Sequence, residues 1–87
     1  MARNVTGKEA ELIINLSYNI RYTIMDKGTS APAVARKAGI KESTIKSYIH
    51  GKAVPDYEIV KKIATALDCE VSDLTKTYDT SMPGTNE

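Results

Sequence analysis

The sequence predicts an all-α fold, a compact domain of five helices. Apolar residues recur at helical spacing in successive segments, and residues that begin and end helices stand between those segments. The 87 residues are enough for one small core. We expect residues 1–76 to form this domain and residues 77–87, which contain almost nothing to bury, to form a flexible tail.

The first helix is expected over about residues 7–26. Thr6 followed by Glu9 is the capping-box pattern that begins a helix. The apolar residues that then repeat at helical spacing are Ile13, Leu16, Ile20 and Ile24. Leu12 and Ile14 lie away from that line, so they either widen the core or belong to a contact between two copies of the chain.

Residues 30–50 contain two short predicted helices, at about 31–38 and about 42–50. Ser30 fits as the N-cap of the first one. Gly39 lies between them, where a left-handed turn residue is needed. Two helices joined by a turn of this length form a helix-turn-helix, whose second helix fits the major groove of DNA.

Two further helices are expected after Gly51. Asp56 follows Pro55 as the N-cap of a fourth helix. The apolar residues expected to line one side of that helix are Tyr57, Val60, Ile63, Ala64 and Leu67. Val71 and Leu74 indicate a short fifth helix.

The second helix of the helix-turn-helix has an apolar and a polar side. The residues expected to fix the crossing of the two helices are Val34, Ala35, Ala38, Ile40, Ile45 and Ile49. The polar residues recur at i, i+1, i+4, i+5 and i+8 and so share one face. They are Glu42, Ser43, Lys46, Ser47 and His50. This polar stripe is the candidate base-reading surface.

Charge is segregated along the chain, although the net charge is only +1. Residues 27–52 carry six basic side chains against Glu42 alone, a net charge of +5. Residues 53–87 have a net charge of −4, and the first 26 residues balance. A positive region on a near-neutral body is typical of a surface that meets phosphates. Lysines that merely solvate helix faces would give the same local count.

The run AxxxGIxxxxIxxYIxGKxxPxxxxxxxIAxxLxxxxxDL, within about Ile20 to Thr75, resembles the Cro and phage-repressor helix-turn-helix family. The resemblance implies a five-helix, lambda-repressor-like DNA-binding domain. It also implies that the start of the recognition helix touches base edges. The residues that match those positions are Glu42, Ser43, Lys46 and Ser47, and the positions matching phosphate contacts are Lys41, His50 and Lys52. Restriction-modification controllers are similar in size and pattern.

The chain departs from the family pattern at two places. Many family members have Gln where Ala31 stands, and Ala31-Pro32 has no side chain that can brace the recognition helix or bind phosphate. We therefore expect that contact from Thr29, from Ser30 or from the helix terminus. Asp68 replaces a usual Gly after the fourth helix, a tolerable change because Asp adopts left-handed backbone more readily than most residues.

The roles of three polar residues stay open at this level. Glu42 either accepts a hydrogen bond from a cytosine amino group or stabilises the positive end of its helix as a first-turn acid. Lys46 either donates to guanine or pairs with a phosphate. His50 either contacts phosphate or is only a polar residue at the helix end.

The sequence therefore predicts a regulator of transcription that binds specific sequences of double-stranded DNA. The resemblance adds a repressor or Cro-like role, a phage or prophage origin in bacteria, and action as a homodimer on DNA. The alternative is a protein-binding module, such as an antitoxin or antirepressor, with secondary DNA contact. Ala31 and the acid Glu42 favour that alternative, whereas Lys41, Lys46 and Lys52 argue against it.

Other classes of function are not expected. His50 lies in the recognition helix, and no glycine-rich phosphate loop or paired acids accompany it, so the sequence predicts no enzyme, no cofactor and no small-molecule substrate. Cys69 is the only cysteine and lacks zinc-site spacing, so we expect a small buried apolar residue. No apolar run of membrane-spanning length and no apolar leader is visible, which predicts a soluble cytoplasmic protein.

Overall fold

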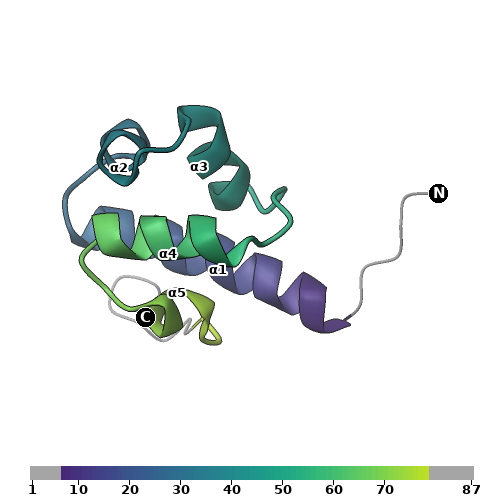
Figure 1. Ribbon diagram of the computed structural model, residues 1–87. Helices are drawn as coiled ribbons and strands as arrows, with labels where there is room; N and C mark the ends of the chain where they lie inside the picture. Colours follow the sequence, from purple (N-terminus) through teal and green to yellow (C-terminus); the bar gives the residue numbers. More distant parts are fainter. Residues whose placement is uncertain (1–6, 79–87) are drawn as a thin grey trace.

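The computed structural model describes residues 7–78, and all the regular structure within that range is helical. The helices are α1 (Gly7–Asp26), α2 (Ala31–Ala38), α3 (Glu42–Ile49), α4 (Tyr57–Ala66) and α5 (Val71–Thr75). α2 and α3 lie above α1 and α4 in the view of Figure 1, and α5 lies below them. The predicted five-helix, all-α fold is confirmed, with the bounds of the first three helices within one residue of those expected.

Local signals in the sequence explain where the helices begin and turn. The hydroxyl of Ser30 accepts from the backbone N–H of Ala33 at 3.3 Å, and one carboxylate oxygen of Asp56 accepts from the N–H of Glu58 at 2.9 Å. Gly39 ends α2 with φ of 74°, the left-handed conformation that the turn requires. Both predicted N-caps and the predicted turn residue are therefore confirmed.

The core draws its apolar side chains from all five helices. The buried apolar residues are Leu16, Ile20, Ile24, Val34, Ala35, Ile45, Tyr48, Val60, Ile63, Ala64, Leu67 and Leu74. Ala35 of α2, one of the residues expected at the crossing of α2 and α3, is only 3% exposed. The prediction that Tyr57 lines the apolar side of α4 is wrong, because this first residue of the helix is 63% exposed and no neighbouring helix covers it.

Two buried asparagines tie α1 to the C-terminal part of the fold. The amide nitrogen of Asn19 donates to the carbonyls of Leu74 at 3.0 Å and Lys76 at 2.8 Å. The side-chain oxygen of Asn15 accepts from the N–H of Tyr78 at 3.2 Å. The two Asn19 bonds occupy carbonyls at the end of α5, where a helix leaves carbonyls without intrahelical partners. They hold α5, which is too short to be stable by itself, against α1.

Two expectations extend outside the described residues. Thr6, one half of the predicted capping box, lies before them, and residues 79–87 of the predicted tail lie after them. Thr77 and Tyr78, the first two residues of that tail, are described, and the Tyr78 ring lies 4.6 Å from the ring of Tyr18 between centroids. Tyr78 thus packs against α1, and the boundary between domain and tail stays a prediction. Among the helices described, none combines the length and the apolar character needed to cross a membrane.

Candidate nucleic-acid interface

α3 is held firmly on one side and open on the other. It runs from the outer surface of the molecule at its start down to α1 at its end, with α2 beside it (Figure 1). On its inner side, the α3 residues Ile45 and Tyr48 are buried in the core. The hydroxyl of Ser17 in α1 donates to the carbonyl of Ile49 at the end of α3. These contacts fix the direction of α3 and leave its other side for solvent or a ligand.

The polar stripe predicted from the sequence lies on this open side. Glu42, Ser43, Lys46 and His50 are exposed, and Ser47 is half-buried. His50 is the C-cap of α3, so its side chain is at the end of the helix nearest α1. The structure thus brings the four candidate base contacts together on one helix face.

Two contacts within the stripe were not foreseen. The ammonium of Lys46 lies 3.1 Å from a carboxylate oxygen of Glu42, with the two side chains 55% and 49% exposed. The hydroxyl of Ser47 donates to the backbone carbonyl of Ser43 at 3.0 Å. The sequence signal for both contacts is the i, i+4 spacing. An exposed pair of this kind contributes only about 0.3–0.5 kcal/mol, so a stronger ligand can replace either partner.

The candidate phosphate contacts flank α2 and α3. Thr29 and Ser30 precede α2, Lys41 stands in the turn between the helices, and Lys52 follows α3, all of them exposed. The hydroxyl of Ser30 is engaged as the N-cap of α2. Lys41 is the N-cap of α3 by position but forms no side-chain cap, so its ammonium stays available.

Tyr48, which the sequence analysis did not single out, anchors the loop that carries Lys52. Its hydroxyl accepts from the backbone N–H of Asp56 at 2.9 Å. The N–H of Lys52 donates to the carbonyl of Ser47 at 2.8 Å, which holds the loop from its other end. Burial raises the pKa of the Tyr48 hydroxyl and keeps it neutral. The signal for this residue was its position three residues after Ile45, on the apolar side of α3.

Comparison with known proteins now identifies the fold. The profile of the Cro/C1-type HTH DNA-binding domain matches residues 19–80. The chain belongs to this Cro/C1-type family. Its resemblance to Cro and phage repressors, stated from the sequence, is thereby confirmed at the level of the family, and the chain carries a DNA-binding domain of the kind found in transcription regulators.

Two solved structures share the architecture of this Cro/C1-type domain. The restriction-modification controller protein C.AhdI from Aeromonas hydrophila is 26% identical, with a TM-score of 0.68 over 71% of this chain and 94% of that one. The hypothetical transcription factor NHTF from Neisseria is 21% identical, with a TM-score of 0.74 over 88% of this chain and 87% of that one. The second likeness shows the fold alone. No curated protein sequence matches the chain significantly.

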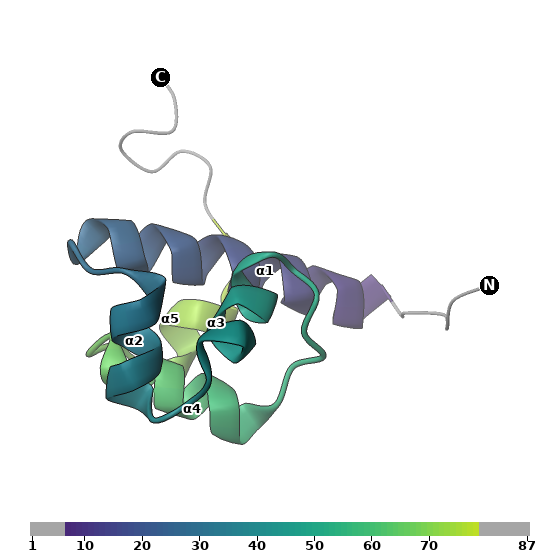
Figure 2. The same ribbon diagram turned by 90° about the horizontal axis from the view of Figure 1, so that it is seen from above.

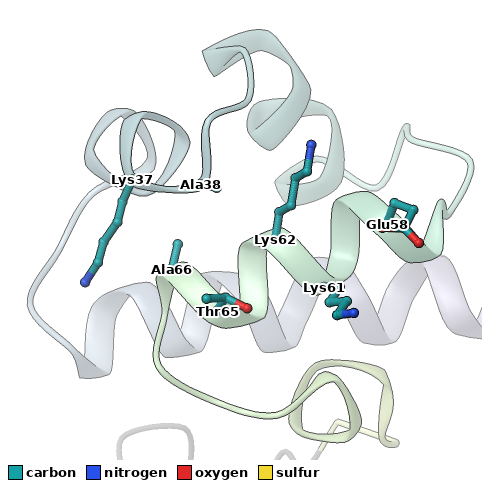
Figure 3. Close-up of a pocket in the computed structure, with 7 residues that line it drawn as sticks. All are labelled: Lys37, Ala38, Glu58, Lys61, Lys62, Thr65 and Ala66. Atoms are coloured by element: carbon teal, nitrogen blue, oxygen red, sulfur yellow. The ribbon is translucent and has the colours of Figure 1, made fainter.

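A cleft on the flank of the Cro/C1-type domain does not form a convergent binding site. It has a volume of about 360 Å³ between α2 and α4. Lys37, Lys61 and Lys62 border it, but their side chains point in different directions. In Figure 3, Lys62 points up from α4, Lys37 points down from α2, and Lys61 lies on the lower side of α4. Three cations spread in this way do not meet on one anion. The positive charge here belongs to the general field of the domain.

The remaining chemistry-bearing residues have structural surroundings. Cys69 was expected to be buried and is half-buried against the core. Burial together with the nearby Asp73 carboxylate raises the pKa of its thiol. Between residues 7 and 78 no cluster of three or more His, Cys, Asp or Glu side chains could hold a metal ion. The open polar side of α3 thus remains the candidate DNA-contacting surface within residues 7–78.

Proposed function

We propose that this protein regulates transcription by binding a specific sequence of duplex DNA, with α3 in the major groove. The observation that carries the proposal is the open polar side of α3 opposite the buried Ile45 and Tyr48. The major groove admits one α-helix, and the edges of its base pairs are distinguishable by hydrogen bonding. A firmly held helix with a polar outer side fits that requirement.

The proposed base contacts come from the first two turns of α3. Lys46 donates to the O6 and N7 atoms of a guanine when its pair with Glu42 opens. Glu42 then accepts from a cytosine amino group, or remains a first-turn acid that supports the helix. Ser43 and Ser47 are near enough to join this contact, since Ser47 bonds to the Ser43 carbonyl.

The proposed phosphate contacts lie on both flanks of the recognition helix. Thr29 and Ser30 meet the backbone at the start of α2, and Lys41, His50 and Lys52 meet it around α3. The net charge of +5 over residues 27–52 favours this orientation of the domain. Such contacts set the register of the protein without reading sequence.

The protein acts on DNA as a homodimer in this proposal. One domain of this size makes only a few base contacts, and two half-sites related by a two-fold axis multiply its specificity. A dimer bound at a promoter excludes RNA polymerase, as a repressor or a Cro-like protein does, or recruits it. The similarity to a restriction-modification controller supports a role in controlling genes.

The test is selection from a pool of random duplexes at about 150 mM salt, followed by sequencing of the retained DNA. The expected result is a palindrome whose half-sites are about 34–36 Å apart, one turn of DNA. Binding that is weak, salt-sensitive and without sequence enrichment would overturn the proposal. Randomised duplexes of the same length and composition serve as the control.

A second candidate function is a protein-binding module, such as an antitoxin or antirepressor. The observation that favours it is the Glu42–Lys46 pair, which neutralises the one basic side chain of α3. The salt dependence of DNA affinity separates the two candidates. A DNA regulator loses affinity with a slope of about 0.9 per phosphate contact on a double-logarithmic plot, whereas a protein-binding module lacks that slope.

A further inference from the structure

The outer side of α1 carries a stripe of residues that the proposed DNA surface does not use, exposed except at Tyr18, which is half-buried beside Tyr78. Seen from above, α1 forms one edge of the molecule, with α4 and α5 on its inner side and α2 and α3 nearest the viewer (Figure 2). Residues along this edge are spaced alternately by four and three positions: Gly7, Glu11, Ile14, Tyr18, Arg21 and Met25. Within this stripe, Ile14 is 52% exposed and Met25 is 76% exposed.

We call these six residues the α1 outer stripe. The stripe is complementary to a second copy of itself that runs in the opposite direction. When two copies of α1 pack antiparallel, a residue before the central position of one copy faces the residue equally far after that position in the other copy. Here the central position is that of Leu16. Ile14 then faces Tyr18, two apolar side chains. Glu11 faces Arg21, two opposite charges. Gly7 faces Met25, the smallest residue against a long one.

We propose that two copies of this chain pair through the α1 outer stripe, α1 against α1 in antiparallel orientation. Under a two-fold axis every contact occurs twice, which is the form that homodimer interfaces take. Tyr78 enlarges the apolar centre, because its ring lies against Tyr18 and borders the same hollow as Ile14. The interface would thus have aromatic side chains at its middle and an ion pair on each side of it.

The geometry of α1 suits a dimer that binds two half-sites, and this role rests on the proposed function. A two-fold axis along the viewing direction of Figure 2 keeps both copies of α2 and α3 on the same side. The end of α3 is bonded to Ser17, next to the centre of the stripe. The axes of packed helices are about 8–10 Å apart. Three such distances, from α3 to α1, from α1 to the second α1 and from there to the second α3, add up to roughly 24–30 Å. This is shorter than the 34–36 Å between half-sites, about one turn of DNA. The start of α3, which carries the candidate base contacts, lies farther from α1 than its end does, which adds to the separation.

The ion pair gives the proposal a sharp test. Glu11 and Arg21 are ten positions apart on one helix, about 15 Å, so they cannot pair within one chain. Each reversal, Glu11→Arg or Arg21→Glu, places like charges opposite each other twice in the dimer. The double variant restores both pairs. An equimolar mixture of the two single variants also restores them, in a heterodimer.

The experiment is sedimentation velocity of the full chain and these variants over a concentration series. We expect each single reversal to weaken dimerisation at least about tenfold, the double variant to recover it, and the mixture to dimerise where neither single variant does. Glu58→Lys and Lys61→Glu, exposed charge reversals on α4, are the matched controls and leave dimerisation unchanged. Circular dichroism checks that every variant keeps its helices.

Three results would overturn the proposal. One is a dimer that is insensitive to both single reversals. Another is loss of dimerisation without recovery in the double variant or the mixture. The third is a wild-type chain that stays monomeric in solution and binds the selected DNA one copy per duplex, as it would if residues 79–87 or a different protein covered the stripe. Enrichment of a DNA sequence by a chain that fails these tests would leave the proposed function standing.

Discussion

The two exposed faces of this domain, the open side of α3 and the outer side of α1, differ in chemistry although the same core supports both. The segment that includes α2 and α3 has a net charge of +5, whereas the first 26 residues balance. α3 presents Lys46 and small polar side chains, and α1 presents Ile14 and Met25. Each helix buries one side in the core. The chemistry of the residues on its exposed side determines whether that side suits a polyanion or another protein surface.

The two faces are also mechanically linked. Ser17 on α1 bonds to the end of α3, and Ile45 of α3 is fully buried in the core shared with α1. In the proposed dimer, α1 therefore sets the position of α3 relative to the second copy. Changes to the shared core should damage both faces, and changes on one face should spare the other.

The largest effect is expected at the shared core. Ile45→Ala removes a fully buried side chain and leaves a cavity, at a cost of about 2–5 kcal/mol of unfolding free energy. Because the total stability of a small domain is of similar size, both faces would be lost. Urea denaturation followed by circular dichroism measures the cost. Val54→Ala, at an apolar residue that is 62% exposed, is the control, with a change within about 0.5 kcal/mol. A similar loss in both variants would contradict the account.

The next effect is expected where the loop after α3 is anchored. Tyr48→Phe leaves the N–H of Asp56 without its acceptor and costs about 1–3 kcal/mol. Burial raises the pKa of Tyr48, so the folded protein releases this proton less readily than the unfolded chain, whose tyrosines ionise near pH 10. Wild-type stability should therefore fall above about pH 10 more steeply than that of Tyr48→Phe. Parallel slopes in urea titrations from pH 8 to 11 would contradict this.

A smaller effect is expected from a single phosphate contact. Lys52→Ala should weaken binding to selected and random duplexes by the same factor and lower the salt slope by about 0.9. Fluorescence anisotropy at several salt concentrations measures both quantities. Lys76→Ala, an exposed lysine next to α5, is the control and leaves affinity unchanged. Loss restricted to the selected duplex would mean that Lys52 reads bases.

The smallest effect is expected at the Glu42–Lys46 pair. Glu42→Gln removes an exposed ion pair and should lower the unfolding free energy by only about 0.3–0.5 kcal/mol. The same change frees Lys46, so affinity for random duplex should rise rather than fall. Lower affinity for random duplex in Glu42→Gln would show that the pair helps to position Lys46 instead of restraining it.

The helices were predictable because their boundaries depend on nearby residues. Ser30, Gly39 and Asp56 act through their own backbone surroundings, and these signals are visible in the sequence. The buried Asn19 was not predictable, because its partners lie 55 and 57 positions away and depend on where α5 packs. Tyr57 was mistaken for a core residue because periodicity does not show where the covering helices end.

The helix face that forms the candidate site was predictable from the sequence, but the side-chain contacts within it were not. Spacing alone put Glu42, Ser43, Lys46 and Ser47 on one face of a helix, and the structure leaves that face open. The spacing did not show that the Glu42 carboxylate pairs with the Lys46 ammonium, because spacing does not determine the rotamers of long side chains. Ile14 was left between two roles, and its exposure in the structure favours the contact between two copies over the core.

The measurement that tests the central claim most directly is a double-mutant cycle between Lys46 and the base pair it reads. Each base pair of the selected duplex is substituted in turn, and affinity is measured for the wild type and for Lys46→Ala. We predict one base pair whose substitution costs the wild type about 1–3 kcal/mol and costs Lys46→Ala almost nothing. If every substitution costs both proteins the same, Lys46 does not read sequence and α3 is not the base-reading element in the form proposed.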